Sequence, residues 1–245
     1  MLRLLKLTFC VGGVCFAQSA EPLRFEVASI RPSSAEAGTA SGIGTRQGTL
    51  MAENVTLLRC IIGAYGTVPT QIVGGPAWIH SARFDILAKA EVPTDDDSLL
   101  MGMLQELLAE RFKLVVHRES RSIPVFVLEA TKNGPKIKTS EGESLTKTRS
   151  SNAGVSMDIA NTDMDAFARV LSRELDRPVV NRTGLQGSYS FMLEWSSENR
   201  SRAKDAPDAG SIFTAIQEQL GLRLRSERAP VEVLVVDSAE RPSDN

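Results

Sequence analysis

Hydrophobic side chains recur at helical spacing in four segments of the chain. In the first, residues 56–65, the apolar positions fall on one face of a helix, and three later segments show the same one-sided pattern. A helix with one apolar face covers it against a sheet or another helix. The four stripes are Leu57, Leu58, Ile61, Ile62 and Tyr65; Leu99, Leu100, Met103, Leu104, Leu107 and Leu108; Met164, Phe167, Ala168, Leu171 and Leu175; and Ile212, Phe213, Ile216 and Leu220.

Short runs of alternating apolar residues between and after these helices predict strands. Each half of the chain then reads as strand, helix, strand, strand, helix, strand, strand. The last two runs of the first half, residues 112–117 and 123–128, are separated by only a few residues. The pattern therefore predicts the α+β class, with an antiparallel hairpin ending each half.

Several motifs occur twice in the same order. Pro124 and Pro230 are 230 − 124 = 106 residues apart, Met51 and Met157 have the same offset, and Gln105 matches Gln217 with a small drift. We interpret this as a duplicated unit of roughly 100 residues; chance similarity between two amphipathic halves is the alternative. The sequence thus predicts two tandem modules, each with about two helices packed on short, mostly antiparallel strands.

Composition divides the chain further. Residues 22–135 form the first predicted module, which includes a glycine-rich loop at 35–48, and residues 154–240 form the second. Residues 136–153 are polar and read as a linker, and residues 196–210 read as a polar insertion within the second module.

The first 17 residues resemble a targeting segment. Arg3 and Lys6 precede an apolar run, residues 7–17, that ends in small residues, which predicts a signal peptide cleaved after Ala17 or, alternatively, after Ala20. A membrane anchor is the other interpretation, but the run is short of the ~20 residues that span a bilayer. We expect an exported protein, periplasmic or extracellular, with no membrane span after cleavage.

Signal removal changes the cysteine count and the charge. One of three cysteines, Cys60, would remain, so no intramolecular disulfide is expected and Cys60 should be a buried small hydrophobe. The formal net charge moves from −2 to −4, because Arg3 and Lys6 are lost while the 30 acidic residues stay. A mildly acidic chain with 5% aromatic residues does not indicate a nucleic-acid partner.

Catalytic and cofactor signatures are missing from the sequence. It has no Gly-x-Ser-x-Gly elbow and no phosphate-binding Gly-Lys-Ser/Thr motif, and two histidines cannot form a three-histidine metal site. The aspartates at 95–97 are expected to cap the following helix. We therefore predict no catalytic residue, no metal and no cofactor, while dispersed carboxylates such as Asp85, Glu194 and Asp237 keep a secreted hydrolase as the alternative.

Two glycine-containing loops occupy matched places in the two halves and are the candidate binding residues. Their glycines are expected to adopt positive φ, and the neighbouring tryptophan is either an exposed hot spot or a packed core residue. The strand at residues 231–236 could also pair with a partner strand, unless the protein pairs its own two halves there. The candidate residues are Gly74, Gly75, Pro76, Trp78, Thr183 and Gly184.

Four segments carry a resemblance to a known family: Phe-Glu-Val-Ala-Ser-Ile-Arg-Pro at 25–32, Val-Gly-Gly-Pro-Ala-Trp at 73–78, residues 109–118 and the ending at 236–245. They resemble a family of secreted proteins from soil acidobacteria that carries a domain of unknown function. Related domains can sit behind membrane metallopeptidases of the antibiotic-sensor type, so the resemblance implies export and a sensing or binding role.

Each half also resembles, at the level of fold, the short N-terminal module of secretins and TonB-dependent receptors. Leu220-Gly-Leu222 fits the helix end of that module, while Glu110-Arg-Phe112 departs from it. The function expected from the sequence is a non-catalytic extracytoplasmic binding or sensing module. Its partner would be a protein, a peptide or a cell-envelope component.

Overall fold

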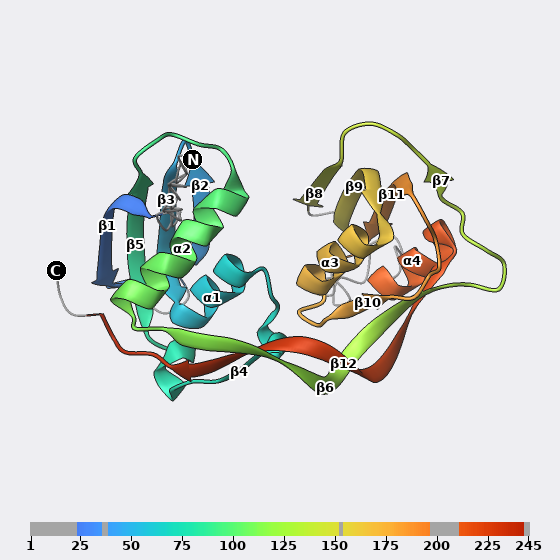
Figure 1. The fold of residues 1–245 in the computed structure, drawn as a ribbon. Coiled ribbons are helices and arrows are strands. Elements are labelled where there is room, and N and C mark those ends of the chain that lie inside the picture. Colours follow the sequence, from blue (N-terminus) through green and yellow to red (C-terminus); the bar gives the residue numbers. More distant parts are fainter. Residues whose placement is uncertain (1–23, 36–38, 152–153, 197–210, 243–245) are drawn as a thin grey trace, which may run out of the picture.

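The computed structural model describes residues 24–35, 39–151, 154–196 and 211–242. Within them the chain is α+β, as expected, with four α-helices and three four-stranded sheets. Figure 1 shows two lobes that lie side by side above a long two-stranded ribbon. The predicted signal peptide and nearly all of the predicted insertion at 196–210 lie outside the described residues.

The first lobe is an antiparallel sheet with two helices on one face. Its strand order is β1-β5-β3-β2. The strands are β1 (Phe25–Pro32), β2 (Gly42–Arg46), β3 (Thr49–Thr56) and β5 (Arg83–Ala90), and the helices are α1 (Leu57–Tyr65) and α2 (Asp97–Arg111). β2 corrects the sequence prediction, because it lies inside the segment 35–48 that we expected to be a loop.

The second lobe has the same kind of layer structure, with strand order β7-β11-β9-β8. Its strands are β7 (Lys138–Thr139), β8 (Leu145–Ser151), β9 (Gly154–Asp163) and β11 (Ser188–Trp195), and its helices are α3 (Met164–Glu174) and α4 (Ile212–Leu220). β7 and β8 lie in the segment 136–153 that we predicted to be a linker. Every residue of β8 is exposed, so this edge strand has the polar composition of a linker.

Polar side chains set the starts of the helices. The Thr56 hydroxyl accepts a hydrogen bond from the Arg59 amide at α1, and Asp163 accepts one from the Ala166 amide at α3. Asp96 accepts from the amides of Ser98 and Leu99 at α2, which confirms the expected cap for this one of the three aspartates.

The ribbon consists of β6 (Val115–Ala130) and β12 (Leu222–Ser238), which pair antiparallel along almost their whole length. β4 (Ile72–Gly74) adds to β12 and β10 (Val179–Asn181) adds to β6, both in parallel. The predicted terminal hairpins are wrong, because residues 115–130 form one continuous strand. The connecting residues Arg-Glu-Ser-Arg-Ser at 118–122 include no glycine, asparagine or aspartate that would favour a tight turn.

The ribbon contributes to both hydrophobic cores. Leu234 and Val236 of β12 are buried in the core of the first lobe, although their strand follows α4 of the second. Leu128 of β6, which follows α2 of the first lobe, is buried in the core of the second. Each lobe is therefore completed by a strand that follows a helix of the other lobe.

Candidate functional site

The first predicted loop lies where β4 meets β12. Gly74 and Gly75 have φ values of +78° and +76°, which confirms the positive φ expected there. A Cβ at Gly74 would lie 2.8 Å from the Val236 carbonyl oxygen, and one at Gly75 would lie 2.9 Å from Val236 Cγ1. Close approach to β12 therefore requires glycine at both positions. Pro76 then precedes the 3₁₀ turn η2 (Ala77–His80), which carries Trp78.

Trp78 packs against the core of the first lobe. Its ring centroid lies 6.3 Å from that of Phe84 in an edge-on arrangement and 6.5 Å from that of Phe112 in a stacked one. Trp78 is half-buried, and the Arg241 guanidinium lies 5.8 Å from its ring centroid. The geometry matches the packed alternative for Trp78 rather than a freely exposed hot spot.

The second predicted loop follows β10. The backbone amide and the hydroxyl of Thr183 both donate to Asn181 Oδ1, at 3.0 and 2.8 Å. Gly184 has a φ of +71°, and a Cβ there would meet no atom within 4 Å.

The two loops lie at opposite ends of the ribbon. β4 pairs with residues 234–236 of β12, whereas β10 pairs with residues of β6 that face residues 224–226. Ten residues of strand separate them by about 33 Å, so the structure does not bring the six predicted residues together.

All of the strand at 231–236 pairs with β6, and residues 234–236 also pair with β4 on the other side. The alternative, that the protein pairs its own two halves at this strand, is confirmed.

The carboxylates of the hydrolase alternative lie on three different sheets. Asp85 is on β5, where it accepts a hydrogen bond of 2.7 Å from the Asn54 amide, Glu194 is on β11, and Asp237 is on β12. No two of them face each other as an acid–base pair would.

Among the described residues, no group of three or more His, Cys, Asp and Glu side chains could hold a metal ion. No helix of the described chain has the length and apolar character that crossing a membrane requires.

An exposed cluster at the first-lobe end of the ribbon was not expected from the sequence. His117 Nδ1 lies 2.8 Å from Asp237 Oδ2 across the β6–β12 pair, and His117 Nε2 lies 3.6 Å from Glu119 Oε2. The hydrogen bond with Asp237 is the main cause that raises the pKa of His117 above its ordinary value. This cross-strand pair joins β6 to β12 at an exposed part of the ribbon.

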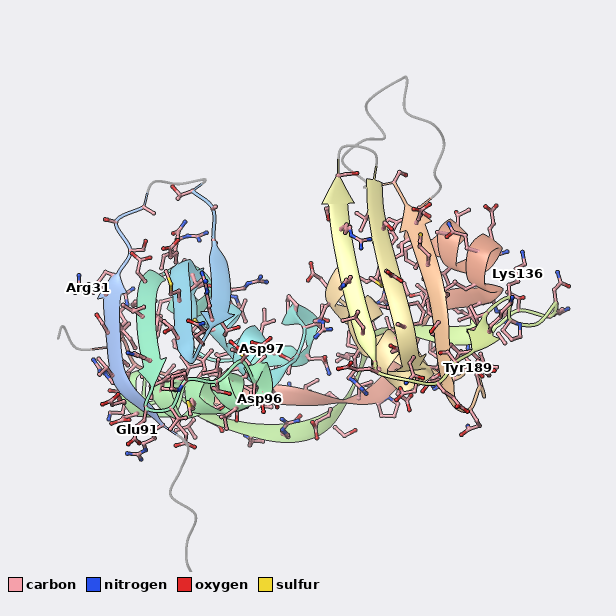
Figure 2. The ribbon with its side chains drawn as sticks, turned by 90° about the horizontal axis from the view of Figure 1, so that it is seen from above. Arg31, Glu91, Asp96, Asp97, Lys136 and Tyr189 are labelled. Carbon is pink, nitrogen blue, oxygen red and sulfur yellow. The ribbon has the colours of Figure 1, made fainter. Side chains whose placement is uncertain are left out.

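A cleft of about 610 Å³ lies between the two lobes and is lined by residues of both. The end of α1 and the following turn form one wall, α3 forms the other, and the ribbon forms the floor (Figure 1). A second hollow of about 330 Å³ adjoins it, sharing Gly66, Thr67 and Arg173, and extends along α1 towards Asp97 at the start of α2. Figure 2, the view from above, shows β2 and β8 as the sheet edges that border the space between the lobes.

Two similar helical faces border the cleft and its adjoining hollow: the face of α3 lines the cleft, and the face of α1 lines the hollow. α3 contributes Ala166, Arg169, Val170 and Arg173, at positions 3, 6, 7 and 10 counted from its first residue. Arg59, Ile62 and Gly63 hold positions 3, 6 and 7 of α1 and line the adjoining hollow, and Gly66, the cap that follows α1, lines both spaces. These positions form one helical face, next to the apolar stripe that is buried in each lobe. The apolar stripes could be identified from the sequence. The cleft could not, because segments about 100 residues apart form it.

Charge and polarity in the cleft are uneven. Arg118 of the floor forms an ion pair with Glu232, whereas Arg169 and Arg173 have neither an ion pair nor a side-chain hydrogen bond within the described residues. Burial, with a smaller effect of the Glu106 charge, raises the pKa of the Tyr65 phenol at the rim. The Thr67 hydroxyl oxygen is buried and has no hydrogen-bond partner in the part of the chain that is described.

Comparison of the chain with known proteins gives a family but no assigned activity. No curated protein matches the chain, and no solved structure matches it. A family profile described as a protein of unknown function matches residues 58–239, from α1 to just beyond the end of β12. The chain therefore belongs to the family of proteins of unknown function DUF3738.

Proposed function

We propose that the protein is an extracytoplasmic, non-catalytic binding or sensing module that takes a peptide segment of a protein or envelope partner into the cleft between its lobes. The observation that carries this proposal is the cleft of about 610 Å³ that both lobes and the ribbon build together. Ligand sites commonly lie at the junction of two structural units and have volumes of roughly 300–1,000 Å³.

The lining of the cleft suits a peptide. Apolar side chains of the floor and walls can cover apolar ligand side chains, and the arginines at the rim can hydrogen-bond to acceptors. Helical walls on both sides leave room for a chain segment running between them. The apolar lining residues are Val68, Val170, Pro178, Val179, Val180, Val231, Val233 and Leu234.

We also infer that the two lobes arose by duplication. The matched faces of α1 and α3, the two strands added in parallel to the ribbon, and the recurring offset of 106 residues in the sequence support this inference. Duplication would explain a cleft with similar walls. Export through residues 1–17 and a relationship to secretin and TonB-receptor modules belong to the same proposal and rest on the sequence.

The test is to fill the cleft without unfolding the protein. Ala166 lies half-buried on the cleft face of α3, so Ala166→Trp would occupy the space between the walls. Ala109→Trp, at an exposed position of α2, introduces the same side chain on a helix outside the cleft. Envelope proteins retained by the chain without residues 1–17 are quantified by mass spectrometry, with circular dichroism as the check of folding. We expect folded Ala166→Trp to lose partners that the wild type and Ala109→Trp retain; equal retention by all three would contradict the proposal.

A further inference from the structure

Arginines from three separate elements converge on the cleft and its adjoining hollow. Arg59 comes from α1, Arg118 from β6, and Arg169 and Arg173 from α3. The acidic residues of the same lining are Glu232 and Asp97, so the lining carries a formal charge of 4 − 2 = +2. The whole chain has a formal net charge of −2. Positive charge is therefore concentrated in the cleft against an acidic background, which favours an anionic ligand.

Both acidic side chains are already engaged. Glu232 pairs with Arg118, and Asp97 accepts a hydrogen bond from the Thr45 hydroxyl. Arg59, Arg169 and Arg173 have no ion pair among the described residues. Other arginines of the ribbon are paired with a glutamate, as Arg223 and Arg225 are with Glu129, while Arg228 donates to the Ser122 carbonyl. Three guanidinium groups without an ion pair therefore line the space where a ligand would lie.

The spacing of two of these arginines matches an extended peptide. Arg169 and Arg173 are four residues apart on α3, so their Cβ atoms are about 5–6 Å apart on one face of the helix. In an extended chain, alternate side chains lie on the same side at intervals of about 6.6 Å. Two carboxylates at alternate positions of a peptide can therefore reach one guanidinium each, as charge-assisted hydrogen bonds require.

We propose that the cleft selects extended acidic peptides in which carboxylates occupy alternate positions, with Arg169 and Arg173 as their anchors. This proposal rests on the proposed function, because it names the ligand class of the same cleft. Arg118 and Glu232 neutralise each other in the floor, so the positive charge that a peptide meets comes from the arginines of the helices. The apolar floor accepts the intervening side chains, which point the other way along an extended chain.

The experiment uses three fluorescein-labelled peptides of roughly ten residues, an extended length of about 33 Å, in which alanine alternates with Glu, Gln or Lys. Fluorescence anisotropy with the chain lacking residues 1–17 gives each Kd at low and high salt. We expect the Glu peptide to bind at least about ten-fold more tightly than the Gln peptide and the Lys peptide not to bind. Raising the salt from about 0.01 M to about 1 M shortens the Debye length from about 30 Å to about 3 Å and should weaken binding of the Glu peptide.

Three Arg→Gln variants test whether the affinity for the Glu peptide depends on the arginines of the cleft. Arg169→Gln and Arg173→Gln should each weaken binding of the Glu peptide about five-fold, the upper range for one partly exposed ion pair. Arg149→Gln removes an exposed arginine of β8 that lines neither hollow, and it should leave the Kd unchanged. Equal affinity for the Glu and Gln peptides, or equal effects of all three variants, would overturn the acidic selectivity while leaving a cleft that binds peptides. Failure of all three peptides to bind would also overturn it, and the retention experiment with Ala166→Trp would then decide the proposed function separately.

Discussion

Ile123 lies directly opposite Ala229 in the pairing of β6 with β12. The two residues are also 229 − 123 = 106 positions apart, the offset that separates Pro124 from Pro230 and Met51 from Met157. In an antiparallel pair of two equivalent strands, equivalent residues face each other only where a two-fold axis crosses the pair. Under the proposed duplication, this pair marks the approximate two-fold axis between the lobes, and the cleft lies beside it.

Replacing Leu104 by Ala should destabilise the protein strongly. Leu104 lies on α2, is fully buried in the first-lobe core, and leaves a cavity when truncated, at a cost of about 2–5 kcal/mol. Urea unfolding followed by circular dichroism measures the loss. Met101→Ala, at a half-buried position of the same helix, should cost less. Equal losses for the two variants would contradict the placement of the buried face of α2.

Gly75→Ala should destabilise more than Gly184→Ala. Both glycines have positive φ, for which an alanine costs roughly 1–2 kcal/mol. At Gly75 the added Cβ would also lie 2.9 Å from Val236 Cγ1 and 3.0 Å from Ile79 Cδ1, whereas at Gly184 nothing lies within 4 Å. The contact adds an overpacking cost of about 1–3 kcal/mol. Thermal unfolding of the two variants side by side gives the difference, and an equal loss for both would mean that β4 does not approach β12 so closely.

Cys60 should be unreactive in the folded protein. Its side chain is buried, and burial raises the pKa of the thiol to about 12, so little thiolate exists at pH 8. Alkylation by iodoacetamide, located by peptide mass mapping, should be slow at Cys60 in the native protein and fast in guanidinium. Rapid modification of Cys60 under native conditions would show that it is accessible.

His117 should titrate above the ordinary histidine value of about 6.5. Its hydrogen bond with Asp237 favours the protonated imidazole in the folded state and so raises its pKa. The stabilising effect is fully present below the unfolded pKa and is lost as the pH rises through the raised folded value. Proton NMR of the imidazole signals gives this pKa, and Asp237→Asn should lower it towards the ordinary value. A pKa unchanged by Asp237→Asn would mean that the pair does not persist in solution.

The local parts of the fold could be predicted from the sequence. The apolar stripe at 97–111 and the aspartates before it define α2 and its cap, because helical periodicity and capping depend on neighbours a few residues away. The buried state of Cys60 follows from its position within the apolar face of α1.

The long-range parts could not be predicted. The sequence of residues 115–130 does not indicate which strand they pair with. A local hairpin and a pairing with a distant strand are therefore equally compatible with it. β8 was missed because a fully exposed edge strand has the composition of a loop. The cleft was not predicted because α1 and α3 are about 100 residues apart in the sequence. Arg169 and Arg173 also look like an ordinary solvated face of a helix.

The most direct test of the account is a disulfide between the two strands of the ribbon, because the cleft exists only if β6 pairs with β12. In Ile123→Cys/Ala229→Cys the two Cα atoms would be about 4.5–5.5 Å apart, within the range that a disulfide spans. Mild oxidation followed by peptide mass mapping should find residues 123 and 229 linked within one chain of folded protein. Two free thiols at these positions after oxidation of the folded variant would contradict the shared ribbon, and with it the site between the lobes.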